Sequence, residues 1–388
     1  MPAKPQRRES SPANPAVPFC DLGAQRRRLG GQIDAAIMRV VEHGQFILGP
    51  EVEQLERNLA AFCDAKHVIT CDNGTSALAL SMIALGIGRG DAVFVPSFTF
   101  CATAEMVALT GATPIFVDVL PDSFNLDAKS LKAGIATAVE LGFTPKAVIP
   151  VDLFGQAADY DAIIPVAAAH KLSVICDAAQ SFGAVYKERK IGTIGALTTT
   201  SFFPAKPFGC YGDGGAIFTD NAALAQTLRS LRFHGKGEHK YDNVRLGLNS
   251  RLDTIQAAVL LEKLTIFTDE LAARDAVAAR YSAALHDLTT VPRLTPESSS
   301  SWAQYTLRLP KHNRDTVAAE LKEAGIPTAV YYPKPLHQQT AYRHFPAAAG
   351  GLKISEQLAG EVLSLPIHPY LDATTQDRII DAVCAALI

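Results

Sequence analysis

The chain has 388 residues, a formal net charge of −3 and 48% hydrophobic residues. This near-neutral balance argues against a nucleic-acid or membrane-surface partner, and no apolar run reaches the roughly 18 residues that cross a bilayer. The length exceeds that of one typical core and predicts two domains.

The N-terminal residues 1–17 are polar and rich in proline, and no apolar segment follows Arg7 and Arg8. We therefore expect a flexible arm and no secretory signal. The seven cysteines are odd in number, show no CxxC spacing and lie mostly in apolar settings, such as Cys176 in "SVICDAAQ". They predict buried thiols in a reducing compartment, by default the cytoplasm, and neither a disulfide nor a metal site.

From residue 67 to about 220, short β-rich runs alternate with stretches that have apolar residues at helical spacing. This order predicts a doubly wound, mostly parallel sheet, in which ligands bind at the carboxyl ends of the strands. The predicted strands are "HVITC" (67–71), "AVFVP" (92–96), "TPIFVDV" (113–119), "KAVIPVDLF" (146–154) and "SVICDAA" (173–179).

The pattern changes near residue 250. Residues 251–285 predict one long helix or two in tandem that leave a large domain, residues 18–250. The rest, 286–388, predicts a smaller α+β domain. Its expected elements are a strand at 303–310, a helix at 315–326 and a final helix at 373–387.

Three segments carry candidate chemistry. In "CDNGTSALAL" (71–80) a strand ends, Asn73 and Gly74 turn, and Thr75 and Ser76 open a helix. N–H groups at a helix start, together with hydroxyls, form an anion site. Any capped helix shares this pattern, so the segment alone does not decide the function.

Asp177 and Lys206 carry the other two signals. Asp177 ends the apolar run "SVICD", where it is either a partner for a buried cationic atom or an ordinary strand-end carboxylate. Lys206 lies in the apolar stretch "SFFPAKPFGCYGDGGA", where it is either a nucleophilic amine with a lowered pKa or a surface lysine.

An anion cradle, a carboxylate for a ring nitrogen and a lysine for an aldehyde match the three features of pyridoxal 5′-phosphate. The phosphate would lie at Gly74, Thr75 and Ser76, and the hydroxyl of Ser201 would add a contact. Phe100, after "VPSFT", would stack on the ring.

The order of these segments resembles the DegT/DnrJ/EryC1/StrS family of nucleotide-sugar aminotransferases, which are fold-type I pyridoxal-phosphate enzymes. The matching pieces span about 18–340 and include "FILGPEVEQLE", "NGTSAL", "DAAQSFGA", "GLNSRLDTIQAAVL" and "AGIPTAVYYPKPLH". The resemblance implies that Lys206 forms the Schiff base, that Asp177 holds the pyridinium nitrogen and that Gln180 contacts the ring hydroxyl. It also implies that Asn249 reaches the phosphate of a neighbouring subunit, so the site would need a homodimer.

Among these relatives, the chain looks most similar to the branch that aminates carbon 3 of UDP-2-acetamido-3-oxo-glucuronate for surface polysaccharides, with L-glutamate as the expected donor. Candidate substrate residues are Arg251, Arg245, His234, Tyr331, Tyr332 and His337. Three alternatives stay open: a 4-aminotransferase of a nucleotide 4-keto-6-deoxysugar, a regulatory protein that binds the cofactor without turnover, and a structural oligomer without cofactor.

Overall fold

The computed structural model describes residues 16–239 and 241–388 of the chain. Most of the predicted arm, 1–17, lies outside this range. Of the two arm residues that are described, Val17 is 6% exposed and packs into the core of the C-terminal part of the chain.

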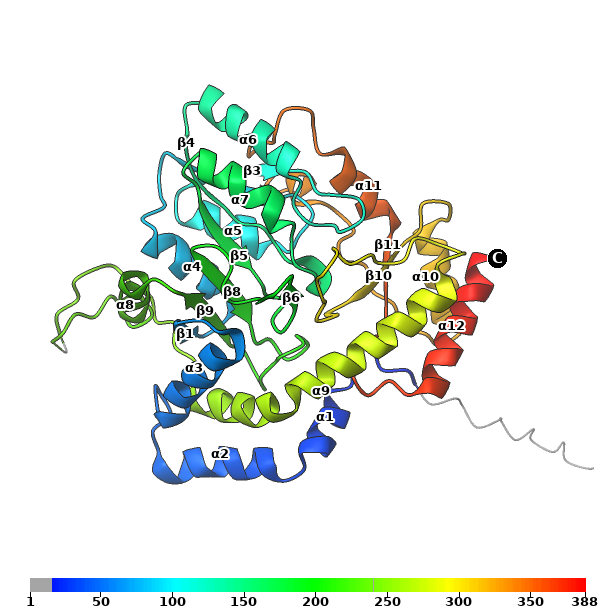
Figure 1. Cartoon of the computed structure of the whole chain (residues 1–388), viewed down its shortest axis with the longest axis horizontal. Coiled ribbons are helices and arrows are strands. Elements are labelled where there is room, and N and C mark those ends of the chain that lie inside the picture. The colour runs from blue at the N-terminus through cyan, green and yellow to red at the C-terminus, as the bar shows by residue number, and fades with distance from the viewer. Residues whose placement is uncertain (1–15, 240) are drawn as a thin grey trace, which may run out of the picture.

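A seven-stranded sheet forms the centre of the molecule (Figure 1). Neighbouring strands from β3 to β8 pair in parallel, and β9 pairs antiparallel with both β8 and β1, so the predicted mostly parallel, doubly wound sheet is confirmed. In spatial order the strands are β1 (His67–Cys71), β9 (Gly215–Thr219), β8 (Leu197–Ser201), β5 (Ser173–Asp177), β4 (Thr144–Val148), β2 (Asp91–Pro96) and β3 (Thr113–Val117).

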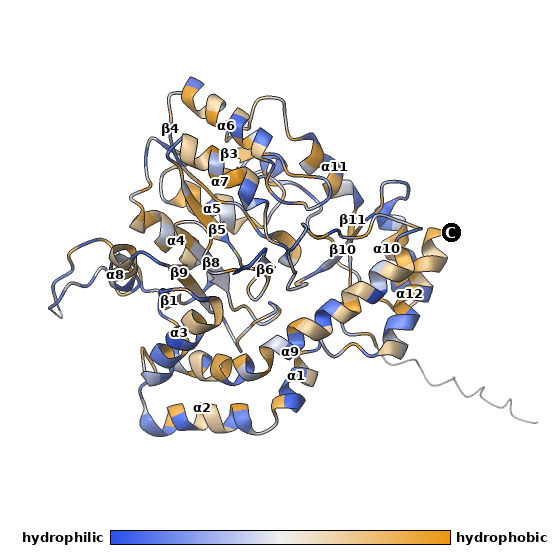
Figure 2. Cartoon of the chain, viewed as in Figure 1, coloured by the Kyte–Doolittle hydropathy of each residue, from blue (hydrophilic) through white to orange (hydrophobic). Residues whose placement is uncertain are grey.

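Helices cover both faces of this sheet because alternate strand residues point to opposite faces. Val93 and Val95 pack with one set of helices, α4 (Gly74–Ala84), α5 (Ala102–Leu109) and α8 (Ala222–Leu231). Ala92 and Phe94 pack with the other set, α6 (Ala128–Glu140) and α7 (Tyr160–Ala169). Figure 2 shows hydrophobic strands at the centre of the molecule.

The predicted strand over 146–154 is shorter than expected. β4 ends at Val148, and a 3₁₀ turn forms at Leu153–Gly155. Pro150 has no N–H to donate to a ladder, which explains why regular pairing stops before it. A short hairpin, β6 (Val185–Tyr186) and β7 (Arg189–Lys190), follows β5.

One helix, α9 (Thr254–Leu285), extends from the central sheet to the C-terminal part of the chain (Figure 1). Its first half packs against α2 (Gln32–His43) and α3 (Pro50–Cys63), and α1 (Leu22–Leu29) precedes them. Its second half enters a separate core through Val277, Tyr281 and Leu285. The same core contains the antiparallel pair β10 (Tyr305–Arg308) and β11 (Val362–Leu365), with α10 (Arg314–Glu323) and α12 (Ala373–Leu387).

The C-terminal part also packs against the sheet edge. Tyr332 lies with Phe98, which follows β2, and with Phe154 of the 3₁₀ turn in one apolar cluster. α11 (Lys353–Glu361) joins the same cluster, and a turn at Leu336–Gln338 bonds back to Ser97. These contacts place C-terminal residues beside the carboxyl ends of the strands.

Candidate active site

Asp177 is the last residue of β5, in the middle of the sheet, and is 6% exposed. Its Oδ2 accepts a hydrogen bond from Thr103 Oγ1 of α5 at 3.1 Å, and its Oδ1 accepts from the backbone N–H of Ala179 at 3.2 Å. Burial raises the pKa of this carboxyl, and the two hydrogen bonds and the charge of Lys206 act in the opposite direction. A buried carboxylate therefore lies at the edge where such sheets bind ligands.

Lys206 lies in the loop between β8 and β9, with its backbone N–H donating to Phe203 O at 2.8 Å. Burial lowers the pKa of its amine, and the carboxylate of Asp177 opposes that shift. The structure thus brings the two predicted residues together across the strand ends. A desolvated lysine beside a single carboxylate loses its proton more readily than a surface lysine does.

The start of α4 lies directly against β8. A Cβ added to Gly74 would lie 2.8 Å from Ser201 Cβ, so only glycine allows this approach. The Asn73 side chain caps the helix by accepting the Ser76 N–H at 2.7 Å. The hydroxyls of Thr75, Ser76 and Ser201, none of them fully buried, therefore lie on the segments that meet at this contact.

Gln180 is 5% exposed, and its orientation is set by the backbone. Its Oε1 accepts the Phe154 N–H at 2.7 Å, which directs the Nε2 group toward Tyr332 Oη, 3.4 Å away. The Tyr332 ring lies 6.4 Å from the ring of Phe100, which is 53% exposed. A fixed amide and an exposed aromatic ring therefore both lie beside Tyr332.

These residues fit pyridoxal 5′-phosphate. The cofactor needs a cradle for a phosphate, a carboxylate for a cationic nitrogen and an amine for an aldehyde, and the close contact of Gly74 with Ser201 brings the first of these together. Within residues 16–239 and 241–388, no group of three metal-binding side chains is present, and no helix is long and apolar enough to span a membrane.

The remaining predicted residues lie in two other places. Asn249 is exposed and forms an isolated antiparallel β-bridge with Phe233. The guanidinium carbon of Arg251 lies 5.1 Å from the centre of the Phe233 ring. His337 is engaged at both ring nitrogens, by Ser97 Oγ at 2.6 Å and by Glu356 Oε1 at 3.0 Å. Asn249 and Arg251 therefore contact Phe233, whereas His337 contacts Ser97, which follows β2 at the carboxyl edge of the sheet.

One contact was not anticipated from the sequence. Thr103 is 1% exposed and donates to Asp177 from a helix that lies 74 positions earlier in the chain. It lies within "VPSFTFCATA" (95–104), and no local pattern in that segment indicates a contact with Asp177.

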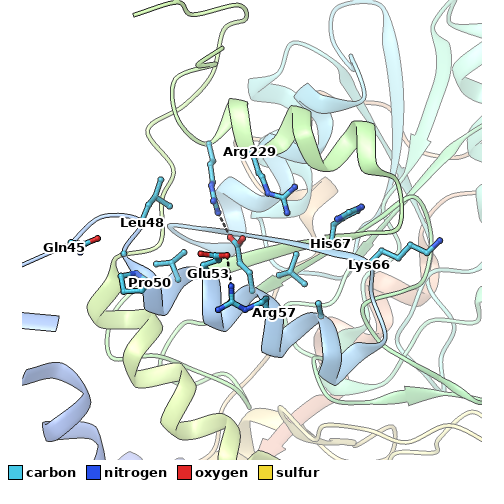
Figure 3. Close-up of a pocket in the computed structure, with 14 residues that line it drawn as sticks. Gln45, Leu48, Pro50, Glu53, Arg57, Lys66, His67 and Arg229 are labelled. Carbon is cyan, nitrogen blue, oxygen red and sulfur yellow. Dashed lines mark hydrogen bonds and ion pairs between the residues drawn. The ribbon is translucent and has the colours of Figure 1, made fainter. Parts of the chain in front are cut away.

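A pocket of about 700 Å³ lies apart from these residues, between α3, the start of β1 and the end of α8 (Figure 3). Arg232 and Glu56 form a salt bridge at its wall, and Arg57 pairs with Glu53. It contains none of the predicted site residues. The Arg232–Glu56 pair ties the end of α8 to α3, whereas the Arg57–Glu53 pair lies within α3.

Comparison with known proteins supports the resemblance. The model of the DegT/DnrJ/EryC1/StrS aminotransferase family matches residues 28–384. The chain is 48% identical over 372 residues to the UDP-2-acetamido-2-deoxy-3-oxo-D-glucuronate aminotransferase of Pseudomonas aeruginosa, covering 96% of this chain and 99% of that protein.

Two solved structures extend this finding. A DegT/DnrJ/EryC1/StrS aminotransferase from Brucella abortus superposes with a TM-score of 0.94 at 54% identity, covering 96% of this chain and 99% of that one. NtdA from Bacillus subtilis, solved with its cofactor PMP bound, gives a TM-score of 0.85 at 30% identity over 98% of this chain and 87% of that one. This chain is therefore a fold-type I aminotransferase that uses pyridoxal 5′-phosphate, and it belongs to the DegT/DnrJ/EryC1/StrS aminotransferase family.

Proposed function

We propose that this chain aminates carbon 3 of UDP-2-acetamido-2-deoxy-3-oxo-glucuronate, with L-glutamate as the amino donor, in the synthesis of a surface polysaccharide. The Pseudomonas relative, at 48% identity over nearly the whole of both chains, supports the choice of sugar. The observation that carries the reaction type is the buried carboxylate of Asp177 beside the partly buried amine of Lys206.

The cofactor residues divide by chemistry. The N–H groups and hydroxyls of Gly74, Thr75 and Ser76, with Ser201, hold the phosphate at the start of α4. Phe100 offers a ring face next to Tyr332. Because the phosphate is anchored at one end and the aromatic ring is covered at the other, the cofactor has one orientation in the site.

When bound, pyridoxal 5′-phosphate supplies a conjugated ring that accepts an electron pair from the substrate carbon. Asp177 keeps the ring nitrogen protonated, since a carboxylate stabilises a cation that it contacts in a buried site. Lys206 would hold the aldehyde carbon of the cofactor, and its Nζ would take up and return a proton. The lowered pKa of Lys206 favours the neutral amine that both steps require.

We infer that the working unit is a homodimer. Asn249 is exposed on the surface of one chain, and it would reach the phosphate held by a second copy. Apolar side chains that one chain leaves exposed support this assembly, among them Leu246 at 93%, Val244 at 53% and Ile47 at 46%.

In the same arrangement, Arg251 would pair with a carboxylate or phosphate of the nucleotide sugar, and Tyr331 with Tyr332 would line the mouth of the site. His337 is held between Ser97 and Glu356, so its part is to fix the wall of that mouth. We also infer a cytoplasmic location, because all seven cysteines are free thiols, which persist in a reducing compartment.

The test is a spectral titration of the purified protein with the cofactor, then with glutamate, then with nucleotide ketosugars. We expect the visible absorbance of the lysine-bound cofactor to fall with glutamate and to return with the 3-keto uronate. A Lys206→Ala protein should show neither the absorbance nor turnover.

The outcomes separate the alternatives. Recovery with a 4-keto-6-deoxysugar instead of the 3-keto uronate would assign the other sugar specificity. Cofactor absorbance that no donor and no ketosugar changes would indicate a regulatory protein without turnover. Transamination by Lys206→Ala would contradict the role of that lysine.

A further inference from the structure

Lys263 is a buried cation outside the residues assigned to the cofactor. It lies on α9 and is 1% exposed. Burial lowers the pKa of its amine to about 8. Placing an ammonium group in an apolar core is unfavourable unless it makes compensating contacts, so the position needs a physical reason.

The contacts of Lys263 converge on one short segment. Its Nζ donates to the carbonyl oxygen of Gly209 at 2.7 Å and lies 4.4 Å from the centre of the Tyr211 ring. Gln256, two turns earlier on the same helix, accepts the Tyr211 N–H at 2.8 Å. Two side chains of α9 therefore hold residues 209–211 in place.

That segment is one end of the loop that carries Lys206. The Cys210 N–H donates to Phe202 O at 2.7 Å, which closes the loop at its base. Gly209 also packs against the segment that precedes Lys206 in the same loop. A Cβ added to Gly209 would lie 2.5 Å from the carbonyl oxygens of Phe203 and Pro204. A shift of Gly209 would therefore move the backbone on both sides of Lys206.

The nearby carboxylate of Glu270 does not pair directly with the ammonium group of Lys263. Glu270 lies two turns further along α9 and accepts hydrogen bonds from Gln25 and Tyr370. Its interaction with Lys263 is a longer-range charge effect, as are those of the thiols of Cys210 and Cys20. The direct partners of the ammonium are a carbonyl dipole and an aromatic face.

We propose that Lys263 is a positioning residue for the cofactor site, which holds the base of the Lys206 loop so that the Lys206 amine stays desolvated and directed toward Asp177. The proposal rests on the proposed role of Lys206. A methionine has a similar length and no charge, so it would fill the space in α9 without holding Gly209.

The proposal predicts different effects of Lys263→Met on thermal stability and on cofactor affinity. Replacing a buried charge with an apolar side chain of similar volume is often neutral or stabilising, so Lys263→Met should unfold at the same temperature as the wild type or higher. Without the contact to Gly209 the loop admits water. The pKa of the Lys206 amine should then rise, and cofactor affinity should fall about tenfold.

Two measurements test this. The first is the dissociation constant of pyridoxal 5′-phosphate, from the absorbance of the bound cofactor. The second uses the protein without cofactor and follows the pH dependence of acetylation at Lys206 by mass spectrometry, which reports the pKa of that amine directly. Lys263→Arg keeps a charged donor and should restore part of the wild-type affinity.

Lys190 provides a matched control. Its Nζ donates to Phe62 O at 2.6 Å and lies 4.5 Å from the Phe62 ring, so it makes the same two kinds of contact away from the Lys206 loop. Lys190→Met should leave both measurements unchanged.

The outcomes are distinct. Lys263→Met with wild-type affinity and an unshifted acetylation midpoint would overturn the positioning role. So would a loss of affinity that only parallels a loss of thermal stability, or an equal loss in Lys190→Met. If the wild type itself shows no absorbance that Lys206→Ala removes, the proposed role of Lys206 fails instead.

Discussion

The hydrogen bond from Thr103 to Asp177 gives the sharpest test of the site. Thr103→Val removes the hydroxyl and keeps the shape of the side chain, which is 1% exposed. The bond joins Thr103 Oγ1 to Asp177 Oδ2 at 3.1 Å, and apart from it only the Ala179 N–H donates to that carboxylate among the described residues. The substitution therefore removes one of two donors.

The size of the effect follows from the partners. A hydrogen bond to a charged group contributes about 1.5–3 kcal/mol, and one pKa unit corresponds to about 1.4 kcal/mol. The pKa of Asp177, which burial already raises, should therefore rise further by about one to two units. If Asp177 holds the protonated ring nitrogen, kcat/KM should fall about 10-fold to 100-fold.

The free protein offers a second readout. Because the folded pKa of Asp177 lies above its unfolded value, its ionised form destabilises the fold, and that cost disappears as the pH falls through the folded pKa. Thr103→Val should be less stable than wild type at neutral pH. The difference should narrow in acid, as measured by urea unfolding.

Thr198→Val is the control. Thr198 is also 1% exposed and donates to Ile194 O at 2.9 Å, so its loss has a similar structural cost without touching Asp177. If the two variants have equal kcat/KM, the reasoning that connects the carboxylate of Asp177 to the chemistry is refuted.

Two further predictions follow from the close contact at Gly74 and from the burial of His368. Gly74→Ala should weaken cofactor binding, because its Cβ would lie 2.8 Å from Ser201 Cβ. The control is Gly360→Ala in α11, where an added Cβ has nothing within 4 Å and should raise the free energy of unfolding by about 0.5–1 kcal/mol. Equal thermal shifts and equal cofactor affinity in both variants would contradict the close contact at Gly74. His368 is 2% exposed, and burial lowers its pKa to about 4, so between its unfolded and folded pKa only the unfolded chain gains the proton. The free energy of unfolding should therefore drop by about 2 kcal/mol between about pH 7.5 and about pH 5, and a His368→Gln protein that kept the same drop would exclude this residue as its source.

Much of the fold could be predicted because its signals are local. Runs of β-branched and apolar residues at 67–71 and 173–179 predicted strands, and β1 and β5 match these limits within two residues, since strands of a sheet covered by helices on both faces are apolar along their length. The helix at 373–387 matches for a similar reason, because its apolar residues recur at helical spacing. The predicted strand at 146–154 was too long because Pro150 interrupts the ladder.

The candidate residues of the site were also readable from the sequence, as a residue type at a strand end. Asp177 ends β5 and Lys206 follows β8, and parallel strands bring their carboxyl ends to one edge. The strand before Lys206, β8, was not among the predicted strands, so only the structure shows that the loop of Lys206 follows a parallel neighbour of β5.

Only the tertiary structure decided which groups surround them. Thr103 reaches Asp177 from α5, Gly74 packs on Ser201, and Lys263 holds Gly209 from α9, in each case across a long stretch of chain. Such contacts depend on how helices dock against the sheet, and no local periodicity encodes that docking. The pKa shifts of Asp177 and Lys206 follow from the same packing, because desolvation exists only once distant segments have closed over a charge.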